Sequence, residues 1–157
     1  MKTKFLTKEQ ALNKIKHFCA YQERCHKEVK EKLNSLGIRK TDIDWIIATL
    51  IEENYLNEER YAIQYAGGKF RINHWGKNKI RYSLKEKLLS EYCINSALKS
   101  IDDEMYDETL RRLAAKKYSS LKDERDLVRK KKTIDYLLQK GYEFELVYKS
   151  VNDCFKG

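Results

Sequence analysis

The sequence predicts an all-α protein made of three tandem three-helix repeats in an elongated, curved array without a β-sheet. Two observations carry this prediction. The 157 residues include no proline and only six glycines, so the chain has few of the residues that tight turns and short strands require. Apolar residues recur at the spacing of amphipathic helices, and the pattern restarts twice along the chain. We therefore expect repeats over residues 1–56, 57–101 and 102–157.

The first repeat contains signals for three helices. Residues 7–10, TKEQ, form a capping-box pattern, so a helix begins there and is expected to end near Glu23. A second helix begins at about His26 and ends before Gly37, because glycine readily adopts the left-handed conformation that terminates helices. A third begins at Thr41, with acidic residues in its first turn.

The same pattern follows in the second and third repeats. Asn57 caps the next helix, residues 73–76 form a turn, and the helix after that is expected to bury Ile80, Leu84 and Leu88. Chance similarity between amphipathic helices is the alternative, but five positions in nearly fixed register exceed what the helical period alone enforces. Those positions are Leu33, Leu84 and Leu137, then Gly37, Leu88 and Gly141, then Ile38, Leu89 and Tyr142, then Ile43, Ile94 and Val147, then Ile47, Leu98 and Val151.

The charge and the cysteines limit the class of protein. A formal net charge of +9 suits a polyanionic partner, either nucleic acid or an acidic protein surface. The four cysteines form no C-x-x-C pair, and no apolar run follows the first residues, so we expect a cytoplasmic protein with reduced thiols. No apolar stretch approaches the roughly 20 residues of a membrane-spanning helix, which argues against a membrane partner.

No catalytic or metal-binding pattern occurs in the sequence. His17, Cys19, Cys25 and His26 lie close together, but their spacing matches no common zinc pattern, and we interpret the cysteines as buried structural residues. The chain has no P-loop, no G-x-S-x-G and no H-E-x-x-H. We therefore expect a protein that is not an enzyme and uses neither a cofactor nor a metal.

Candidate binding residues concentrate in residues 69–87, where seven basic residues stand against one acid, Glu86. Three of them, Lys77, Arg81 and Lys85, are four residues apart and form one stripe along a helix. Such a stripe could meet phosphates or acidic side chains; the alternative is a solvated helix flank without a partner. The candidate set here is Lys69, Arg71, Lys77, Lys79, Arg81 and Lys85, and the neighbouring aromatic residues are Phe70, Trp75 and Tyr82.

A second basic run occupies residues 129–132. Four consecutive residues sweep about 300° around a helix and cannot share one face, so we keep only Arg129 and Lys132 as candidate binding residues. Lys130 and Lys131 would point toward the core unless the helix begins nearby or their side chains extend outward along their stems.

Several segments resemble the RecX family of RecA regulators, over about residues 11–155. Residues 55–62, YLNEERYA, resemble the family's YLNDERFA-type segment. Residues 76–98 resemble its segment G-P-x-K-I-x-x-E-L-x-x-K-G-I, and residues 137–142, LLQKGY, resemble its closing L-x-x-R-G-F. The three segments occur in the family's order, which makes the resemblance more specific than any one of them.

The resemblance implies tandem three-helix repeats that bind the RecA nucleoprotein filament and inhibit strand exchange and ATP hydrolysis. We expect a monomer whose partners are RecA and single- or double-stranded DNA. Two alternatives remain open: a general nucleic-acid-binding helical protein that acts through the central stripe, and a scaffold whose basic face meets an acidic protein.

Three residues depart from the family pattern. Cys25 stands where the family usually has a serine that could cap a helix, and Lys77 replaces the usual proline. Leu88 replaces the usual glycine, which removes a helix-stop signal. We therefore expect the helix after Gly76 to run longer, or to end without a left-handed residue.

Overall fold

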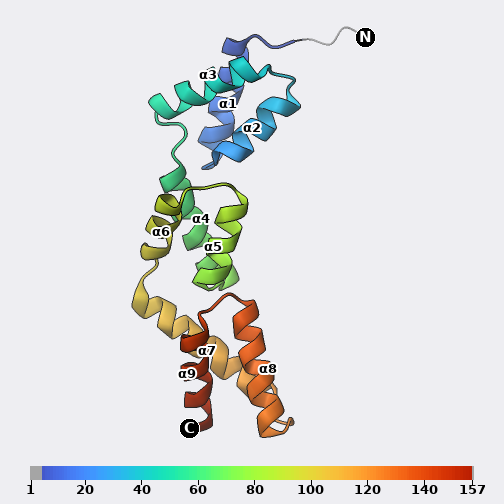
Figure 1. Ribbon diagram of the computed structural model, residues 1–157, viewed down its shortest axis with the longest axis vertical. Helices are drawn as coiled ribbons and strands as arrows, with labels where there is room; N and C mark the ends of the chain where they lie inside the picture. The colour runs from blue at the N-terminus through green and yellow to red at the C-terminus, as the bar shows by residue number, and fades with distance from the viewer. Residues whose placement is uncertain (1–4, 157) are drawn as a thin grey trace.

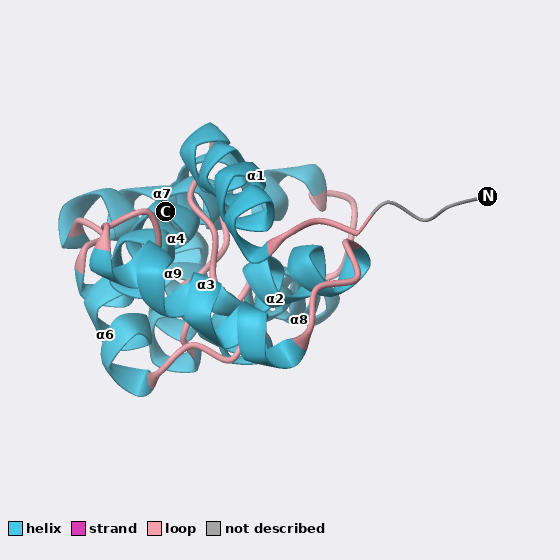
Figure 2. Cartoon of the chain, turned by 90° about the horizontal axis from the view of Figure 1, so that it is seen from above, coloured by secondary structure: helices cyan, strands magenta, loops and turns pink. Residues whose placement is uncertain are grey.

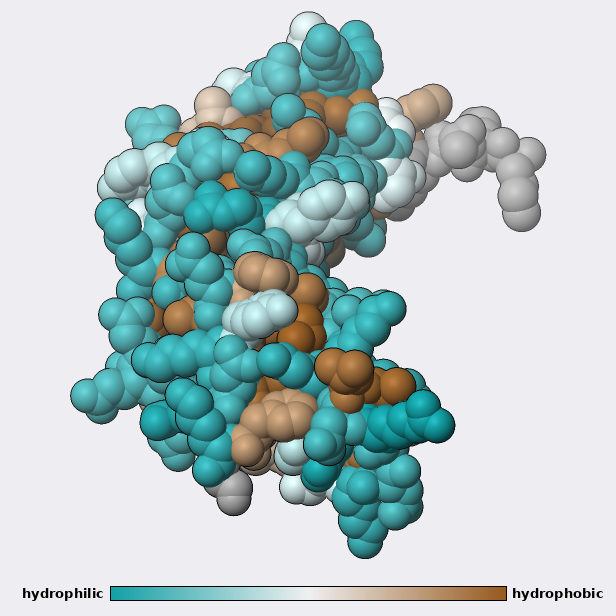
Figure 3. All heavy atoms as spheres, turned by 60° about the horizontal axis from the view of Figure 1, so that its bottom comes forward, coloured by the Kyte–Doolittle hydropathy of each residue, from teal (hydrophilic) through white to brown (hydrophobic). Residues whose placement is uncertain are grey.

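The computed structural model describes residues 5–156, which fold into nine α-helices and no strand (Figures 1 and 2). Figure 1 shows three groups of helices stacked along one long axis, and Figure 3 shows the molecule hollowed on one side. The helices are α1 (Lys8–Tyr21), α2 (His26–Ser35), α3 (Lys40–Glu52), α4 (Glu58–Asn73), α5 (Lys77–Glu86), α6 (Glu91–Lys99), α7 (Asp103–Ser120), α8 (Asp126–Gln139) and α9 (Phe144–Lys156). The predicted fold class is confirmed.

Each group of three helices packs mainly within itself: α1 with α2 and α3, α5 and α4 with α6, and α7 with α8 and α9. The predicted helix starts agree with the structure, since Thr7 accepts a hydrogen bond from the Gln10 amide and Asn57 from the Arg60 amide. The helix α4 continues through Gly67 and Gly68 and ends at Asn73, where the sequence predicts a turn. The exact limits of the three repeats, 1–56, 57–101 and 102–157, stay a prediction.

The second helix of each repeat ends in the same way. Gly37, Leu88 and Gly141 have positive φ angles of 74°, 64° and 98°. In each case the amide of the following residue donates to the carbonyl oxygen five residues earlier, at 3.2, 3.3 and 3.2 Å. This hydrogen bond defines a Schellman motif, which satisfies a carbonyl that the end of a helix leaves free. Positions 37, 88 and 141, which the sequence places in the same register, therefore also share one backbone conformation.

The structure at Leu88 contradicts two predictions: how α5 ends, and the burial of Leu88. The helix α5 ends at Glu86 and does not run longer, and Leu88 adopts the left-handed conformation although it is not glycine. Its side chain is 77% exposed, so it does not belong to the core with Ile80 and Leu84. Helical spacing no longer applies after the left-handed turn, and Leu89 is buried instead.

The described residues form two hydrophobic cores. One core is confined to α1–α3 and the segment before α4, and it includes Ile15, Leu33 and Leu50. The other runs continuously through α4–α9, and Cys25 joins it from the first repeat. The second and third repeats thus share one hydrophobic core, to which the first repeat contributes only Cys25.

Both cysteines of the first repeat that the sequence assigned to the interior are buried. Cys19 is 7% exposed and Cys25 is 0% exposed. Burial raises the pKa of the Cys19 thiol to about 11, and it also raises the pKa of Cys25. The Cys25 thiol donates to the Glu28 carboxylate in the first turn of α2.

Two glycines bring the second and third repeats into backbone contact. The Gly76 amide donates to the Lys140 carbonyl at 2.7 Å, and the Asn78 amide donates to the Gly141 carbonyl at 2.9 Å. A Cβ added at Gly76 would lie 2.3 Å from the Gly141 carbonyl carbon, and one at Gly141 would lie 2.3 Å from the Lys79 Cβ. Only glycine permits so close an approach at both positions.

Candidate functional site

The stripe predicted from the sequence lies on the flank of α5 that faces α6. Arg81 and Lys85 each lie 3.5 Å from a carboxylate oxygen of Glu91, at the start of α6. Lys77 lies 3.8 Å from Asp103, at the start of α7. These side chains are therefore brought together as predicted, but each already has an acidic neighbour from another helix.

Those acidic neighbours change the electrostatics of the stripe. The sequence shows one acid, Glu86, within the basic cluster, whereas Glu91 and Asp103 reach the stripe only because α6 and α7 fold beside it. Glu91 is 64% exposed in its side chain and Asp103 is 94% exposed, so these ion pairs are screened by solvent. The stripe keeps a positive potential that is weaker than its composition suggests.

Three lysines between α4 and the opposite flank of α5 lie over aromatic rings: Lys69 of α4, Lys79 of α5 and Lys87, which directly follows α5. The Nζ atoms of Lys69 and Lys79 lie 4.9 and 4.7 Å from the centre of the Trp75 ring. The Nζ atoms of Lys69 and Lys87 lie 5.5 and 5.4 Å from the centre of the Tyr65 ring. Cation–π attraction holds these ammonium groups in place without neutralising them.

No carboxylate of residues 5–156 lies within 4.0 Å of the ammonium groups of Lys69, Lys79 or Lys87. Lys87 is a member of this group that the candidate set left out. Its place among the basic residues 69–87 was the one sign in the sequence that it could bind a partner. Its contact with the Tyr65 ring of α4 could not be predicted, because sequence spacing does not bring Tyr65 near Lys87. The aromatic residue Trp75, by contrast, was expected beside the basic cluster and lies at its centre.

Two further residues of the cluster lie apart from these lysines. The Arg71 guanidinium folds back over Gly67, where an added Cβ would lie 2.7 Å from Nη1. Arg71 also lines a cavity of about 290 Å³ with Met105. Phe70, one of the aromatic residues next to the cluster, is only 4% exposed and packs against Tyr106, so it belongs to the core.

The candidates of the third repeat have partners within their own repeat. The Arg129 Nε donates to the Tyr118 carbonyl at 2.8 Å, and its guanidinium lies 3.4 Å from the centre of the Tyr118 ring. Lys132 forms an ion pair with Glu124 at 2.7 Å. Because α8 begins at Asp126, the whole basic run is helical.

The two lysines between these candidates behave differently from each other. Lys130 is half-buried, with its Nζ atom 5.5 Å from the centre of the Tyr148 ring and 5.6 Å from that of Phe155. Its stem lies against α9, as expected of a core-side lysine that extends outward. Lys131 is exposed, which agrees with the alternatives of a nearby helix start or an outward side chain.

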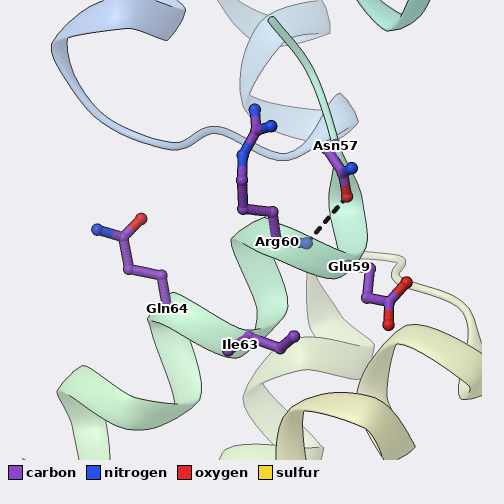
Figure 4. Close-up of a pocket in the computed structure, with 5 residues that line it drawn as sticks. All are labelled: Asn57, Glu59, Arg60, Ile63 and Gln64. Atoms are coloured by element: carbon purple, nitrogen blue, oxygen red, sulfur yellow. Dashed lines mark hydrogen bonds between the residues drawn. The ribbon is translucent and has the colours of Figure 1, made fainter. Parts of the chain in front are cut away.

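The pocket at the start of α4 brings together no convergent set of reactive groups. Figure 4 shows the pocket at the start of α4, where Arg60, Ile63 and Gln64 point in separate directions. Arg60 is already paired with Glu23 at 2.5 Å. Within residues 5–156 no three His, Cys, Asp or Glu side chains are placed to hold a metal ion, and no helix is long and apolar enough to cross a membrane.

Comparison with known proteins identifies the family. The model of the second three-helix domain of RecX matches residues 57–98, and the model of the third three-helix domain of RecX matches residues 103–151. These matches cover more than half of the chain. The chain belongs to the RecX family.

Relatives and solved structures agree with this assignment. Regulatory protein RecX of Clostridium perfringens (strain 13 / Type A) is 38% identical over 121 residues, which are 76% of this chain and 56% of the relative. Regulatory protein RecX of Clostridium botulinum (strain Eklund 17B / Type B) is 36% identical over 130 residues, which are 82% of this chain and 60% of the relative. The chain thus spans less than two thirds of the length of these relatives.

The crystal structure of RecX from Lactobacillus salivarius superposes with a TM-score of 0.87 at 25% identity, over 96% of this chain and 97% of that one. A second crystal structure of regulatory protein RecX gives a TM-score of 0.84 at 23% identity, over 93% of this chain and 71% of that one. The arrangement of helices described above is therefore the RecX fold.

Lys77, where the RecX pattern usually has proline, contributes a hydrogen bond that proline could not make. Its amide donates to the Tyr106 hydroxyl at 2.9 Å, and that hydroxyl donates in turn to Glu143. Burial and the hydrogen bond to Glu143 raise the pKa of Tyr106 far above its usual range, so the hydroxyl remains a donor. The substitution therefore adds a polar link between α5 in the second repeat and α7 and α9 in the third.

Proposed function

We propose that this chain regulates the RecA recombinase by binding the RecA nucleoprotein filament and restraining ATP hydrolysis and strand exchange. Membership of the RecX family carries this proposal, because its relatives are named regulatory proteins. The chain acts by binding, in the cytoplasm, and is not itself an enzyme. RecA and the DNA within the filament are its partners.

The shape and charge of the molecule support a filament partner. Three repeats along one axis present a long surface, and a filament repeats its own surface over a long distance. The net charge of +9 favours association with a DNA-bearing assembly. We assign the contact to the two flanks of α5, whereas Arg129 and Lys132, which are engaged within the third repeat, contribute less.

The direct test measures RecA-catalysed ATP hydrolysis on single-stranded DNA while the chain is added in substoichiometric amounts. The proposal predicts a falling rate as the chain is added. A variant with Lys77, Arg81 and Lys85 changed to glutamate should inhibit less. The matched control carries the same change at the exposed residues Lys14, Lys30 and Lys116. An unchanged rate of ATP hydrolysis at every ratio of the unmodified chain to RecA would refute the proposal.

One alternative is favoured by the lysines around Trp75 and Tyr65. Ammonium groups without carboxylate partners are suited to nucleic acid in general. A general nucleic-acid-binding protein would bind DNA with steep salt dependence, and RecA would make no difference. Measuring DNA binding with and without the recombinase separates the two functions.

A further inference from the structure

We propose that a track of ring-held lysines on α4 and α5 binds one strand of nucleic acid, with phosphates on the lysines and a base on Trp75. The proposal rests on the proposed function for its biological setting, since the filament contains such a strand. The binding itself requires no recombinase. The residues of this lysine–aromatic track are Tyr65, Lys69, Trp75, Lys79 and Lys87, and none of the acid-paired stripe belongs to it.

The track is continuous because neighbouring lysines share rings. Lys87 and Lys69 both lie over Tyr65, and Lys69 and Lys79 both lie over Trp75. Tyr65 is itself fixed by a hydrogen bond between its hydroxyl and Ser83 of α5. In the unbound chain the rings therefore hold the three ammonium groups in a row.

The basic residues on the two flanks of α5 differ in their neighbours, which are carboxylates on one flank and aromatic rings on the other, and this difference decides which flank is available to phosphate. On the stripe, a phosphate must compete with Glu91 or Asp103 for each cation. On the track, a lysine can leave a ring at the modest cost of one cation–π contact and keep its full charge. A polyanion consequently gains more from the track than from the stripe, although both carry three basic residues.

Both ends of the track reach the neighbouring repeats. At one end, the Lys27 ammonium of α2 donates to the Glu86 carbonyl at 3.2 Å, beside Lys87. At the other, the Lys140 ammonium after α8 donates to the Asn73 carbonyl at 3.1 Å, two residues before Trp75. These additional cations extend the positive row past α5 in both directions, which suits a strand that runs along the molecule.

The aromatic rings favour a single strand over a duplex. Surfaces that bind single strands without sequence preference combine a basic row with rings on which bases stack. Trp75 is half-buried in the turn between α4 and α5, where it packs against the core and has Lys69 and Lys79 over its ring. A base that stacks on Trp75 displaces an ammonium group from the ring onto an adjacent phosphate. A duplex keeps its bases paired and can use only the lysines.

The test measures binding of the full chain to a fluorescein-labelled oligothymidine by fluorescence anisotropy over a series of salt concentrations, without recombinase. Changing Lys69, Lys79 and Lys87 to alanine should make the negative slope of log affinity against log salt shallower by about 2, because three phosphate contacts on a single strand are lost. The matched control changes the stripe residues Lys77, Arg81 and Lys85 to alanine and should change the slope much less. Equal losses in the two variants would overturn the assignment of the track.

A second pair of variants keeps the test independent of folding. Changing the three track lysines to arginine preserves charge and ring contacts, and it should retain the salt slope. Trp75→Leu preserves an apolar side chain, and it should weaken strand binding about fivefold or more while leaving the slope unchanged. An unaffected affinity in Trp75→Leu, or a duplex of the same length that binds as tightly as the strand, would refute the single-strand assignment.

The same variants distinguish this inference from the proposed function. If the chain fails to bind oligothymidine but still slows ATP hydrolysis by RecA, the track is refuted and the proposed function stands. If it binds oligothymidine through the track but has no effect on RecA, the track stands and the proposed function is refuted.

Discussion

Replacing Gly76 by alanine is expected to lower the free energy of unfolding by about 3 to 5 kcal/mol. The new Cβ would lie 2.3 Å from the Gly141 carbonyl carbon, where ordinary contact begins at 3.4 Å. Both sides of this contact are backbone, so neither can rotate away. Separation of the two backbone segments would strain or break the hydrogen bonds from Gly76 to Lys140 and from Asn78 to Gly141, which measure 2.7 and 2.9 Å.

The magnitude follows from two contributions. Overpacking a tight contact costs about 1–3 kcal/mol, and each buried hydrogen bond that is lost adds about 1 kcal/mol. Urea unfolding followed by circular dichroism measures the sum. Gly68→Ala is the matched control, because a Cβ there meets nothing within 4 Å and alanine favours the helix by about 1 kcal/mol. The two variants should shift stability in opposite directions. A Gly76→Ala variant within about 0.5 kcal/mol of the original chain would refute the close backbone contact.

Two further predictions concern Leu88 and the cysteines. Leu88→Gly should raise the free energy of unfolding by roughly 1 kcal/mol, because glycine adopts the left-handed conformation without strain; a lower melting temperature would contradict this. Burial raises the pKa values of Cys19 and Cys25, so both remain thiols at mildly alkaline pH. Iodoacetamide should therefore modify the less buried Cys93 first, as peptide mapping would show; equal rates at all three would contradict their burial.

Much of the fold could be predicted because it depends on local signals. Thr7 and Asn57 begin helices through hydrogen bonds to residues three positions away, which a sequence pattern can reveal. The equivalence of Gly37 and Gly141 with Leu88 followed from register alone, and all three share one backbone conformation. The leucine at position 88 led to a wrong prediction, because the chain makes the Leu89–Leu84 hydrogen bond and buries Leu89 although leucine disfavours the left-handed conformation.

The candidate site was less predictable, because charges are modified by residues far away in sequence. Helical spacing placed Arg81 and Lys85 on one flank of α5, but it could not show that Glu91 of α6 would lie beside them. Nor could it show that Lys87 and Lys69 share the Tyr65 ring, since they belong to different elements. The sequence thus located the basic region, whereas the packing of α4 and α6 decided which of its cations lack acidic partners.

Cosedimentation tests the central claim most directly. RecA filaments would be formed on single-stranded DNA with a slowly hydrolysed ATP analogue, mixed with the chain and centrifuged. The proposed function predicts that the chain sediments with the filament at substoichiometric amounts, and more efficiently than with the same DNA without RecA. A chain that remains in the supernatant with filaments present, or that sediments equally with DNA alone, would contradict regulation through the filament.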